Sequence, residues 1–241
     1  MAAGLEVERS DDTVIITAAS DDENLFSLEM IGALSDEIDA ATVDGLRFAR
    51  IRARGPVFCV GRERVGTTPL ALRDEAALIV RANETLRTTP LTVIAEVHGD
   101  AAGFGMGVVA SADIAIAADT ARFWFPEILG GLAPSVVISW LSKTVPYKVA
   151  FHMVTTGDPV DAHEAKRLGL ITDAVPAGEL EAVVDHRLKR LRDMSPGGIK
   201  EIKEFFVRIR NLDPAQSSVS AVETLALSAV RNKAEKEQAG T

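Results

Sequence analysis

The segment 91–118 constrains the fold more than any other part of the chain. Apolar residues at 91–97 predict a buried strand, a glycine-rich turn (GFGMG) follows at 103–107, and small residues up to 111 predict a helix. A second apolar strand is predicted at 112–118. Glycines at a strand-to-helix junction let backbone N–H groups approach a ligand closely. This strand–turn–helix–strand unit therefore indicates an α/β fold with a ligand site at the turn.

The composition is typical of a globular chain with an aliphatic core. Of the 241 residues, 47% are hydrophobic but only 5% are aromatic, so Ala, Val, Leu and Ile must fill most of the core. The net charge of −9 argues against nucleic acid as a partner, because phosphate binding requires clustered Lys and Arg. No apolar run approaches the ~20 residues that cross a bilayer, and the four histidines lack metal-ligand spacing. We therefore predict neither a membrane partner nor a metal.

The cysteine content and the N-terminus bear on the compartment. The single cysteine, Cys59, permits no disulfide within the chain, which is typical of a reducing cytoplasm. The N-terminal segment MAAGLEVERSDD lacks a basic stretch followed by an apolar one, so it does not resemble a signal peptide. We therefore expect a cytoplasmic location.

The rest of the chain alternates strands and helices up to residue 176. Strands are predicted at 5–8, 13–18, 46–52, 57–60, 122–125 and 170–175, and helices at 27–42, 71–87, 135–152 and 161–168. Such alternation predicts crossover connections and a largely parallel sheet. After residue 176 the pattern predicts helices alone, at 177–193, 196–210 and 214–235. We therefore predict a core over 1–176 that carries the site, followed by a helical subdomain over 177–241.

Five segments, in order along the chain, resemble motifs of the crotonase, or enoyl-CoA hydratase/isomerase, superfamily. They are NLFS at 24–27, PVFCVGRE at 56–63, VIAEVHGDAAGFGMG at 93–107, FPEILGGLAP at 125–134 and TTGDPVDAHEAKRLGLITDAVP at 155–176. The resemblance extends over residues 5–235. It implies a crotonase-like (ClpP/crotonase) spiral core of repeated ββα units. It also implies that the C-terminal helices assemble a homotrimer, or a hexamer built as a dimer of trimers.

The resemblance also implies a site for an acyl-CoA thioester, which is the substrate, with no further cofactor. Members of the superfamily hold the thioester carbonyl oxygen with two backbone N–H groups, which by position belong to Arg62 and Phe104 in this chain. Two preorganised amides, one of them at a helix N-terminus, stabilise the negative oxygen of an enolate. Substrate-binding positions carried over in the same way are Val60, Gly61, Gly103, Gly105, Gly107 and Pro134.

The number of carboxylates bears on the reaction. Hydratases of the superfamily carry two glutamates, of which the second corresponds to Glu127 and the first falls on Gly107. Adding water needs one group for the water and another to protonate carbon, whereas moving a double bond needs one proton shuttle. The segment 129–141 is also more similar to the isomerase pattern than to the hydratase pattern. We therefore expect isomerase-type proton transfer by Glu127.

Several alternatives stay open at this point. An enoyl-CoA hydratase of fatty-acid breakdown would need a substitute for the absent glutamate, for which Asp100 is the candidate. A catalytically inactive member would only bind CoA esters. The glycine turn would also suit a dinucleotide, although such a loop usually follows the first strand. A Clp-type serine peptidase shares the fold, but Ser111 lacks a suitable histidine and the Gly-x-Ser-x-Gly context.

One carboxylate within the core needs a partner. Glu96 interrupts the apolar strand 91–97, where an unpaired charge is costly. We expect His98 or Arg122 to supply that partner, and we expect Glu96 to be structural.

Overall fold

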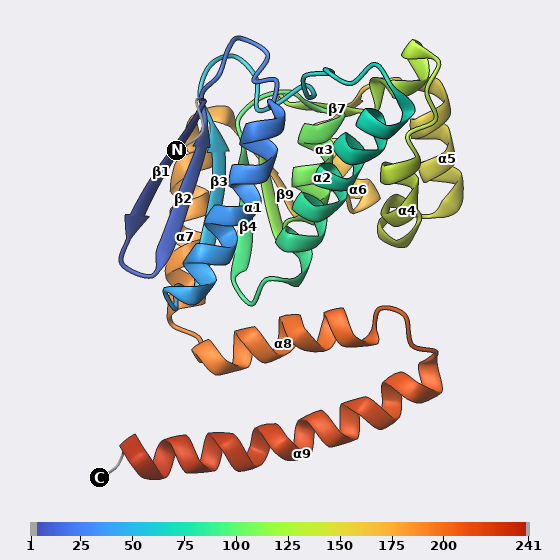
Figure 1. The fold of residues 1–241 in the computed structure, drawn as a ribbon. Helices are drawn as coiled ribbons and strands as arrows, with labels where there is room; N and C mark the ends of the chain where they lie inside the picture. The colour runs from blue at the N-terminus through green and yellow to red at the C-terminus, as the bar shows by residue number, and fades with distance from the viewer. Residues whose placement is uncertain (1–3, 240–241) are drawn as a thin grey trace. The chain divides into compact units, whose positions relative to one another are not determined.

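The computed structural model describes the backbone of residues 4–239 and the side chains of residues 4–231 (Figure 1). The chain divides into two compact units, Met1–Arg190 and Leu191–Thr241. The first three residues of the N-terminal segment analysed above, and the last two of the predicted helical subdomain, lie outside the described residues. The predicted boundary at residue 176 stays a prediction.

The first unit alternates strands and helices, as the sequence pattern predicts. Its strands are β1 (Leu5–Ser10), β2 (Thr13–Ala18), β3 (Phe48–Ala53), β4 (Thr92–Val97), β5 (Ala101–Ala102), β6 (Ile114–Ala118), β7 (Arg122–Trp124), β8 (Val160–Asp161) and β9 (Asp173–Val175). Its helices are α1 (Leu28–Val43), α2 (Pro69–Thr88), α3 (Phe104–Ser111), α4 (Ser135–Thr144), α5 (Tyr147–Thr156), α6 (Ala162–Leu168) and α7 (Leu180–Arg192), with short 3-10 helices η1 (Pro126–Gly130) and η2 (Ala177–Glu179).

The strands form two sheets. The larger has the order β1-β2-β3-β4-β6-β9, in which β1 pairs antiparallel at the edge and every other pairing is parallel. The smaller has the order β5-β7-β8. In each of the units β4–β5–α3 and β6–β7–α4, the first strand belongs to the larger sheet and the second to the smaller sheet, and a helix follows. This is the repeated ββα pattern that the resemblance implies, and it confirms the α/β class.

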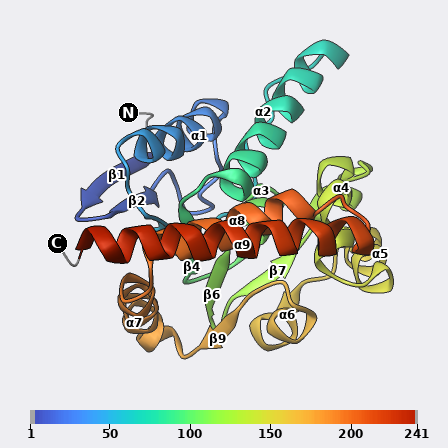
Figure 2. The same cartoon turned by 90° about the horizontal axis from the view of Figure 1, so that it is seen from below.

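Helices cover both faces of the larger sheet. In two perpendicular views α1 and α2 lie on one face and α7 on the other (Figures 1 and 2). The helix α3 is almost entirely buried, which explains its small residues. On the opposite face α7 turns Leu180, Val184 and Leu188 inward at helical spacing. The glycine-rich turn before α3 is therefore held between packed layers and is fixed in position by them.

The carboxylate in the central strand has a different partner from the one that the sequence suggests. Glu96 of β4 accepts a hydrogen bond from Arg50 of the neighbouring β3 at 2.5 Å, and Arg50 also donates to Asp185 of α7 at 2.8 Å. The prediction of His98 or Arg122 as partner is wrong. Arg50 lies on the strand next to β4, within reach of Glu96, whereas His98 lies beyond the end of β4 and hydrogen-bonds the Gly55 carbonyl, and Arg122 pairs with Asp100.

Two predicted elements differ in the structure. Residues 57–60 form no strand, and Cys59 makes only an isolated bridge to Ala101. The predicted helix 135–152 is two helices, α4 and α5, which are separated at Pro146. Proline disfavours helical conformation in the residue before it, and Val145 is accordingly extended.

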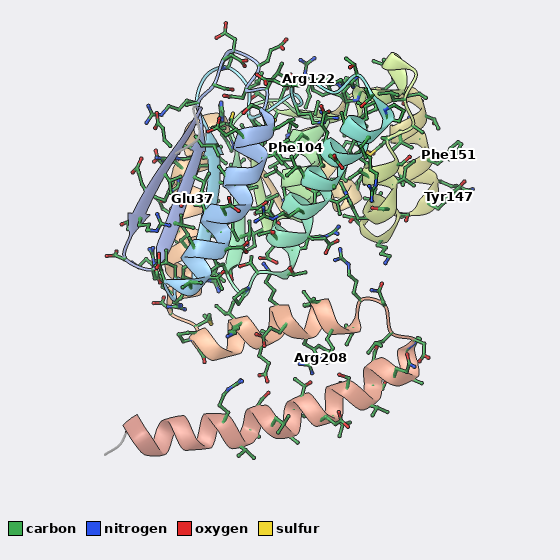
Figure 3. The ribbon with its side chains drawn as sticks, viewed as in Figure 1. Glu37, Phe104, Arg122, Tyr147, Phe151 and Arg208 are labelled. Carbon is green, nitrogen blue, oxygen red and sulfur yellow. The ribbon has the colours of Figure 1, made fainter. Side chains whose placement is uncertain are left out.

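The face of α5 carries two exposed aromatic rings. Tyr147 and Phe151 are both exposed, and their ring centroids lie 5.8 Å apart. Figure 3 shows both side chains pointing outward from α5, whereas Phe104 lies among the packed elements of the first unit. Of these three aromatic side chains, only Phe104, at the glycine-rich turn, is buried.

The second unit is a pair of helices, α8 (Pro196–Ile209) and α9 (Pro214–Ala239), that run back along one another (Figure 1). Arg208 of α8, labelled in Figure 3, donates to Thr224 of α9 at 3.1 Å, and Arg231 pairs with Glu201 at 2.8 Å. Among the described helices of the chain, none is both long and apolar enough to cross a membrane.

Candidate active site

The glycine-rich turn packs directly on the segment around Cys59. A Cβ on Gly105 would lie 2.1 Å from the Cys59 carbonyl oxygen, so only glycine permits this approach. The Ala102 N–H donates to the same oxygen at 2.9 Å. Phe104 immediately precedes Gly105, and Arg62 lies three residues after Cys59. The contact therefore brings together the two segments that carry the candidate amide donors.

Both candidate donors have free N–H groups. The Phe26 N–H donates to the Gly61 carbonyl at 3.2 Å, and the Glu63 N–H donates to the Phe26 carbonyl at 2.9 Å, which holds the backbone on both sides of Arg62. Phe104 is the first residue of α3, where N–H groups have no intrahelical acceptor and the helix dipole is positive. Within the described part of the chain, neither N–H donates to a protein acceptor.

Glu127 lies against the same turn. It follows Pro126 at the start of η1, directly after β7. A Cβ built on Gly103 would lie 3.6 Å from the Glu127 Oε1 atom and 3.6 Å from the Gly61 Cα atom. The φ of Gly103 is +51°, a left-handed value that glycine adopts readily. Gly103 therefore stands between the carboxylate and the loop that carries Arg62.

The surroundings of the Glu127 carboxyl favour its protonated form. Its Oε2 atom is buried and has no hydrogen-bond partner within the described residues. Desolvation by burial raises the pKa of Glu127, while its own backbone N–H and the charges of Arg64 and Arg62 lower it without offsetting the burial. A carboxylate with a raised pKa is a stronger base, which suits proton transfer from carbon.

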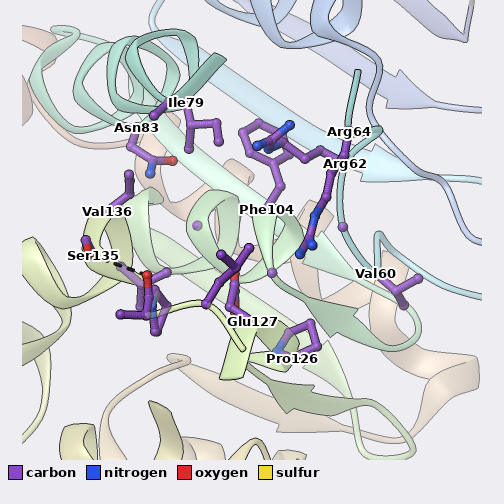
Figure 4. Close-up of a pocket in the computed structure, with 18 of the residues that line it drawn as sticks. Val60, Arg62, Arg64, Ile79, Asn83, Phe104, Pro126, Glu127, Ser135 and Val136 are labelled. Atoms are coloured by element: carbon purple, nitrogen blue, oxygen red, sulfur yellow. Dashed lines mark hydrogen bonds between the residues drawn. The ribbon is translucent and has the colours of Figure 1, made fainter. Parts of the chain in front are cut away.

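These groups line one cavity of about 370 Å³ (Figure 4). The sequence-predicted residues that line it are Val60, Gly61, Arg62, Gly103, Phe104, Gly107, Glu127 and Pro134. Gly105 does not line the cavity and instead packs on Cys59. The structure thus brings nearly all of the predicted positions together, while the chemical role of each stays a prediction.

Asp100, the candidate substitute for a second glutamate, lies elsewhere. It is not among the residues that line the cavity, and it accepts from Arg122 at 2.6 Å. The Arg122 backbone N–H donates to the same carboxylate at 2.9 Å. Asp100 is therefore engaged in holding the start of β7, and the structure does not place it for chemistry in the cavity.

Sequence reasoning missed two polar residues of α2 near the site. Asn83 is 3% exposed and lines the cavity next to Gly107. Glu75 is also buried and accepts from Arg62 at 2.6 Å and from the Val65 and Gly66 N–H groups. The missed signal is helical periodicity, because these positions share the inward face of α2 with apolar Ala82 and Leu86.

The Glu75 carboxylate holds the loop next to the site. Burial raises its pKa, but the hydrogen bonds from Arg62, Gly66 and Val65 and the Arg62 charge outweigh that effect, so its pKa lies below the usual value. A carboxylate that stays ionised keeps the Arg62 side chain and the loop around it in place.

A cationic group is available at the cavity. Arg62 and Arg64 both line it, and Arg64 is exposed with no ion-pair partner among the described residues. An anionic part of a ligand would meet this charge. No three His, Cys, Asp or Glu side chains of the described chain come together as a metal site, and the absence of a metal stays a prediction.

Cys59 should be unreactive in the folded protein. The side chain is 1% exposed, its thiol donates to the Gly61 carbonyl at 3.2 Å, and burial raises its pKa to about 12. At pH 8 about one thiol in ten thousand is then ionised, and the thiolate is the reactive form. Titration with a chromogenic disulfide should detect no thiol within minutes before denaturation and one afterwards. Rapid reaction of the native protein would contradict the burial of Cys59 next to Gly61.

Comparison with known proteins places this site in a family. Residues 13–240 match the family model described as enoyl-CoA hydratase/isomerase. The crystal structure of an enoyl-CoA hydratase from Mycobacterium smegmatis superposes with a TM-score of 0.90 at 27% identity, covering 94% of this chain and 91% of that one. This likeness confirms the crotonase-like fold and disfavours the dinucleotide-loop alternative.

Two curated relatives add detail. The mouse protein named enoyl-CoA hydratase domain-containing protein 3, mitochondrial, is 37% identical over 177 residues, which is 71% of this chain and 59% of the relative. The chain therefore spans less than two thirds of that relative's length. A trans-2-decenoyl-[acyl-carrier-protein] isomerase from Streptococcus mutans is 27% identical over 190 residues, 75% of this chain and 72% of that protein.

The comparison also corrects the expected location. The mouse relative is named as mitochondrial, and the prediction of a cytoplasmic location is wrong in this light. The reasoning failed because a single buried cysteine shows only that the chain needs no internal disulfide. That property does not distinguish one reducing compartment from another.

Proposed function

Because the chain belongs to the enoyl-CoA hydratase/isomerase family, we propose that it binds an acyl-CoA thioester and transfers a proton on the acyl chain through Glu127. One observation carries this proposal. The free N–H groups of Arg62 and Phe104 belong to segments that meet at Gly103, and the Glu127 carboxylate lies against the same glycine. A thioester oxygen held by the two amides would place the acyl carbons beside the carboxylate.

The proposed reaction moves a double bond. Glu127 takes a proton from carbon 2 of a 3-enoyl thioester, and the electrons of that C–H bond pass into a dienolate whose oxygen accepts from Arg62 and Phe104. The same carboxyl then returns the proton to carbon 4, which leaves the 2-enoyl thioester. No electrons are gained or lost, so we propose that no further cofactor takes part. Losing one oxyanion donor typically costs roughly 3–4 kcal/mol of barrier.

Isomerisation is favoured over hydration by the number of carboxylates. Gly107 has no side chain, and Asp100 is engaged with Arg122, so Glu127 is the single carboxylate among the residues that line the cavity. The relative from Streptococcus mutans is itself named as an isomerase, although its acyl group is carried by a protein. Hydration, and binding without turnover, are the alternatives that the experiment must separate.

The test is incubation with 3-enoyl-CoA and 2-enoyl-CoA in parallel, in D₂O, with products followed by mass spectrometry. We expect double-bond migration and deuterium incorporation on carbon, whereas 3-hydroxyacyl-CoA would indicate a hydratase. Because Glu127 must be ionised to take a proton and its pKa is raised, kcat/KM should fall as pH decreases through that raised pKa. Tight binding with neither product would leave only the inactive alternative.

We also propose assembly into a homotrimer or a hexamer. In the second unit Phe206 of α8 is 67% exposed, and Val222 and Leu225 of α9 are also exposed. Apolar side chains that are exposed on a helix surface would be buried against other copies of the chain in such an assembly, and their exposure supports the proposal.

A further inference from the structure

The cavity contains a buried polar group that the proposed proton transfer does not use. Asn83 is 3% exposed, and its Oδ1 atom is buried with no hydrogen-bond partner among the described residues. Figure 4 shows the carboxamide projecting from α2 towards the cavity, across from the segment of Pro126 and Glu127. Buried amides are normally paired, because an unsatisfied polar atom carries the full cost of its desolvation. The position therefore points to a ligand atom as the absent partner.

The carboxamide lies against the place where a side chain on Gly107 would begin. A Cβ on Gly107 would lie 3.1 Å from the Asn83 Oδ1 atom and 3.3 Å from its Nδ2 atom. A side chain at position 107 would therefore crowd the Asn83 amide, and glycine leaves room for it. Asn83 can donate and accept hydrogen bonds but cannot take up a proton, so it can hold a group without acting as a base.

The Asn83 amide, which comes from α2, lies beside Gly107 of α3, and this place determines which ligand atom it meets. Gly107 follows Phe104 by three residues, so it lies about 4.5 Å further along the helix axis. If the Phe104 N–H holds the thioester oxygen, this spacing places Asn83 beside acyl carbons one or two bonds beyond the thioester carbonyl carbon. A bare hydrocarbon there would leave the amide unpaired, whereas a hydroxyl or carbonyl oxygen would satisfy it.

We propose that Asn83 is a specificity-determining residue, which hydrogen-bonds an oxygen on the acyl chain close to the thioester. A thioester that carries this oxygen then binds more tightly than one with a plain hydrocarbon chain, the simple 3-enoyl thioester included. This inference rests on the proposed function, because it takes the thioester to be held by Arg62 and Phe104. The acyl oxygen would be the hydrogen-bond partner that the buried amide lacks. The role of Asn83 is then to bind the acyl chain, whereas Glu127 transfers the proton.

The test compares two thioesters that differ by one oxygen, acetoacetyl-CoA and butyryl-CoA, with binding measured by calorimetry on the full chain. The wild-type protein should bind acetoacetyl-CoA at least about tenfold more tightly, the order of one satisfied buried hydrogen bond. Asn83→Leu, which keeps the branched shape of the side chain and removes its polar atoms, should abolish that preference. Glu84→Gln, an exposed neighbour on α2 that pairs with Arg87, is the control and should keep the wild-type preference.

The outcomes separate the two proposals. Equal wild-type affinity for both thioesters would overturn the role of Asn83 while leaving the proposed function standing, and this measurement depends on no variant. A preference that survives in Asn83→Leu would also overturn it, because the discrimination would then arise elsewhere. Failure of both thioesters to bind the wild-type chain would overturn the proposed function and this inference together.

Discussion

Replacing Glu127 with Gln should reduce turnover of the enoyl thioester by about 10²- to 10⁴-fold, the usual contribution of a positioned acid–base group. Glutamine has nearly the same shape, so the cavity and the free N–H groups of Arg62 and Phe104 should remain in place. The affinity for a CoA thioester should therefore change little. Initial rates and calorimetric titration of the same preparation measure the two quantities separately.

Glu63→Gln is the matched control. Glu63 is an exposed carboxylate next to Arg62 that does not line the cavity, so the variant makes the same charge change near the site. It should retain full turnover. Normal turnover in Glu127→Gln would refute the role of Glu127 in proton transfer. Equal losses of turnover in both variants would also refute it, because they would show that any loss of negative charge near the site has the same effect.

The stability of Glu127→Gln gives a second readout. The pKa of Glu127 is raised in the folded state, so its contribution to folding is most favourable below the unfolded pKa and is lost as pH rises through the folded pKa. Above that range the ionised carboxylate is partly buried at a cost in free energy, which glutamine avoids. The Tm of Glu127→Gln at neutral pH should therefore equal or exceed that of the wild type. Lost activity would then not be attributable to unfolding.

Gly105→Ala should be among the most damaging single-methyl substitutions in the chain. The new Cβ would lie 2.1 Å from the Cys59 carbonyl oxygen and 2.9 Å from the Cys59 Cβ atom, so backbone must move. Overpacking a core typically lowers the free energy of unfolding by about 1–3 kcal/mol. Because the new methyl group would meet a backbone carbonyl that cannot rotate away, we expect a loss at the upper end of this range or above it. Separation of the two amide segments should also lower turnover by about 10²- to 10³-fold, the value of one oxyanion donor.

Gly32→Ala provides the comparison for that variant. Gly32 lies in α1, and a Cβ there would meet no atom within 4 Å. Alanine in place of glycine inside a helix stabilises by roughly 0.5–1 kcal/mol. Urea unfolding should therefore give opposite changes in the free energy of unfolding for the two variants. If Gly105→Ala proved as stable and as active as Gly32→Ala, the proposed close approach at Cys59 would be incorrect.

Local patterns identified most of the fold because they depend on neighbouring residues. The apolar run 91–97, the glycine turn and the small-residue helix appear in the structure as β4, the β5–α3 turn and α3. Ser27 caps α1 and accepts a hydrogen bond from the Met30 N–H at 3.1 Å. The break at Pro146 was available in the sequence as well, but the apolar spacing around it obscured the boundary between α4 and α5.

Partners distant in sequence were not predictable in the same way. Glu96 pairs with Arg50, 46 residues away, because β3 and β4 are adjacent in the sheet. Asn83 meets Gly107 because α2 packs on α3. Helical periodicity indicates that Asn83 faces inward, but neither partner can be identified from periodicity, since each depends on which elements become neighbours.

The amino-acid sequence by itself determined that a glycine-rich strand-to-helix turn exists and that one glutamate follows it, because both are matters of residue type and spacing. Only the tertiary structure decided that Gly103 stands between that glutamate and the Arg62 loop, and that an unpaired amide from α2 faces the same cavity. The physical reason is that a site is made by contacts across layers. Such contacts are set by how sheets and helices pack, which no single segment encodes.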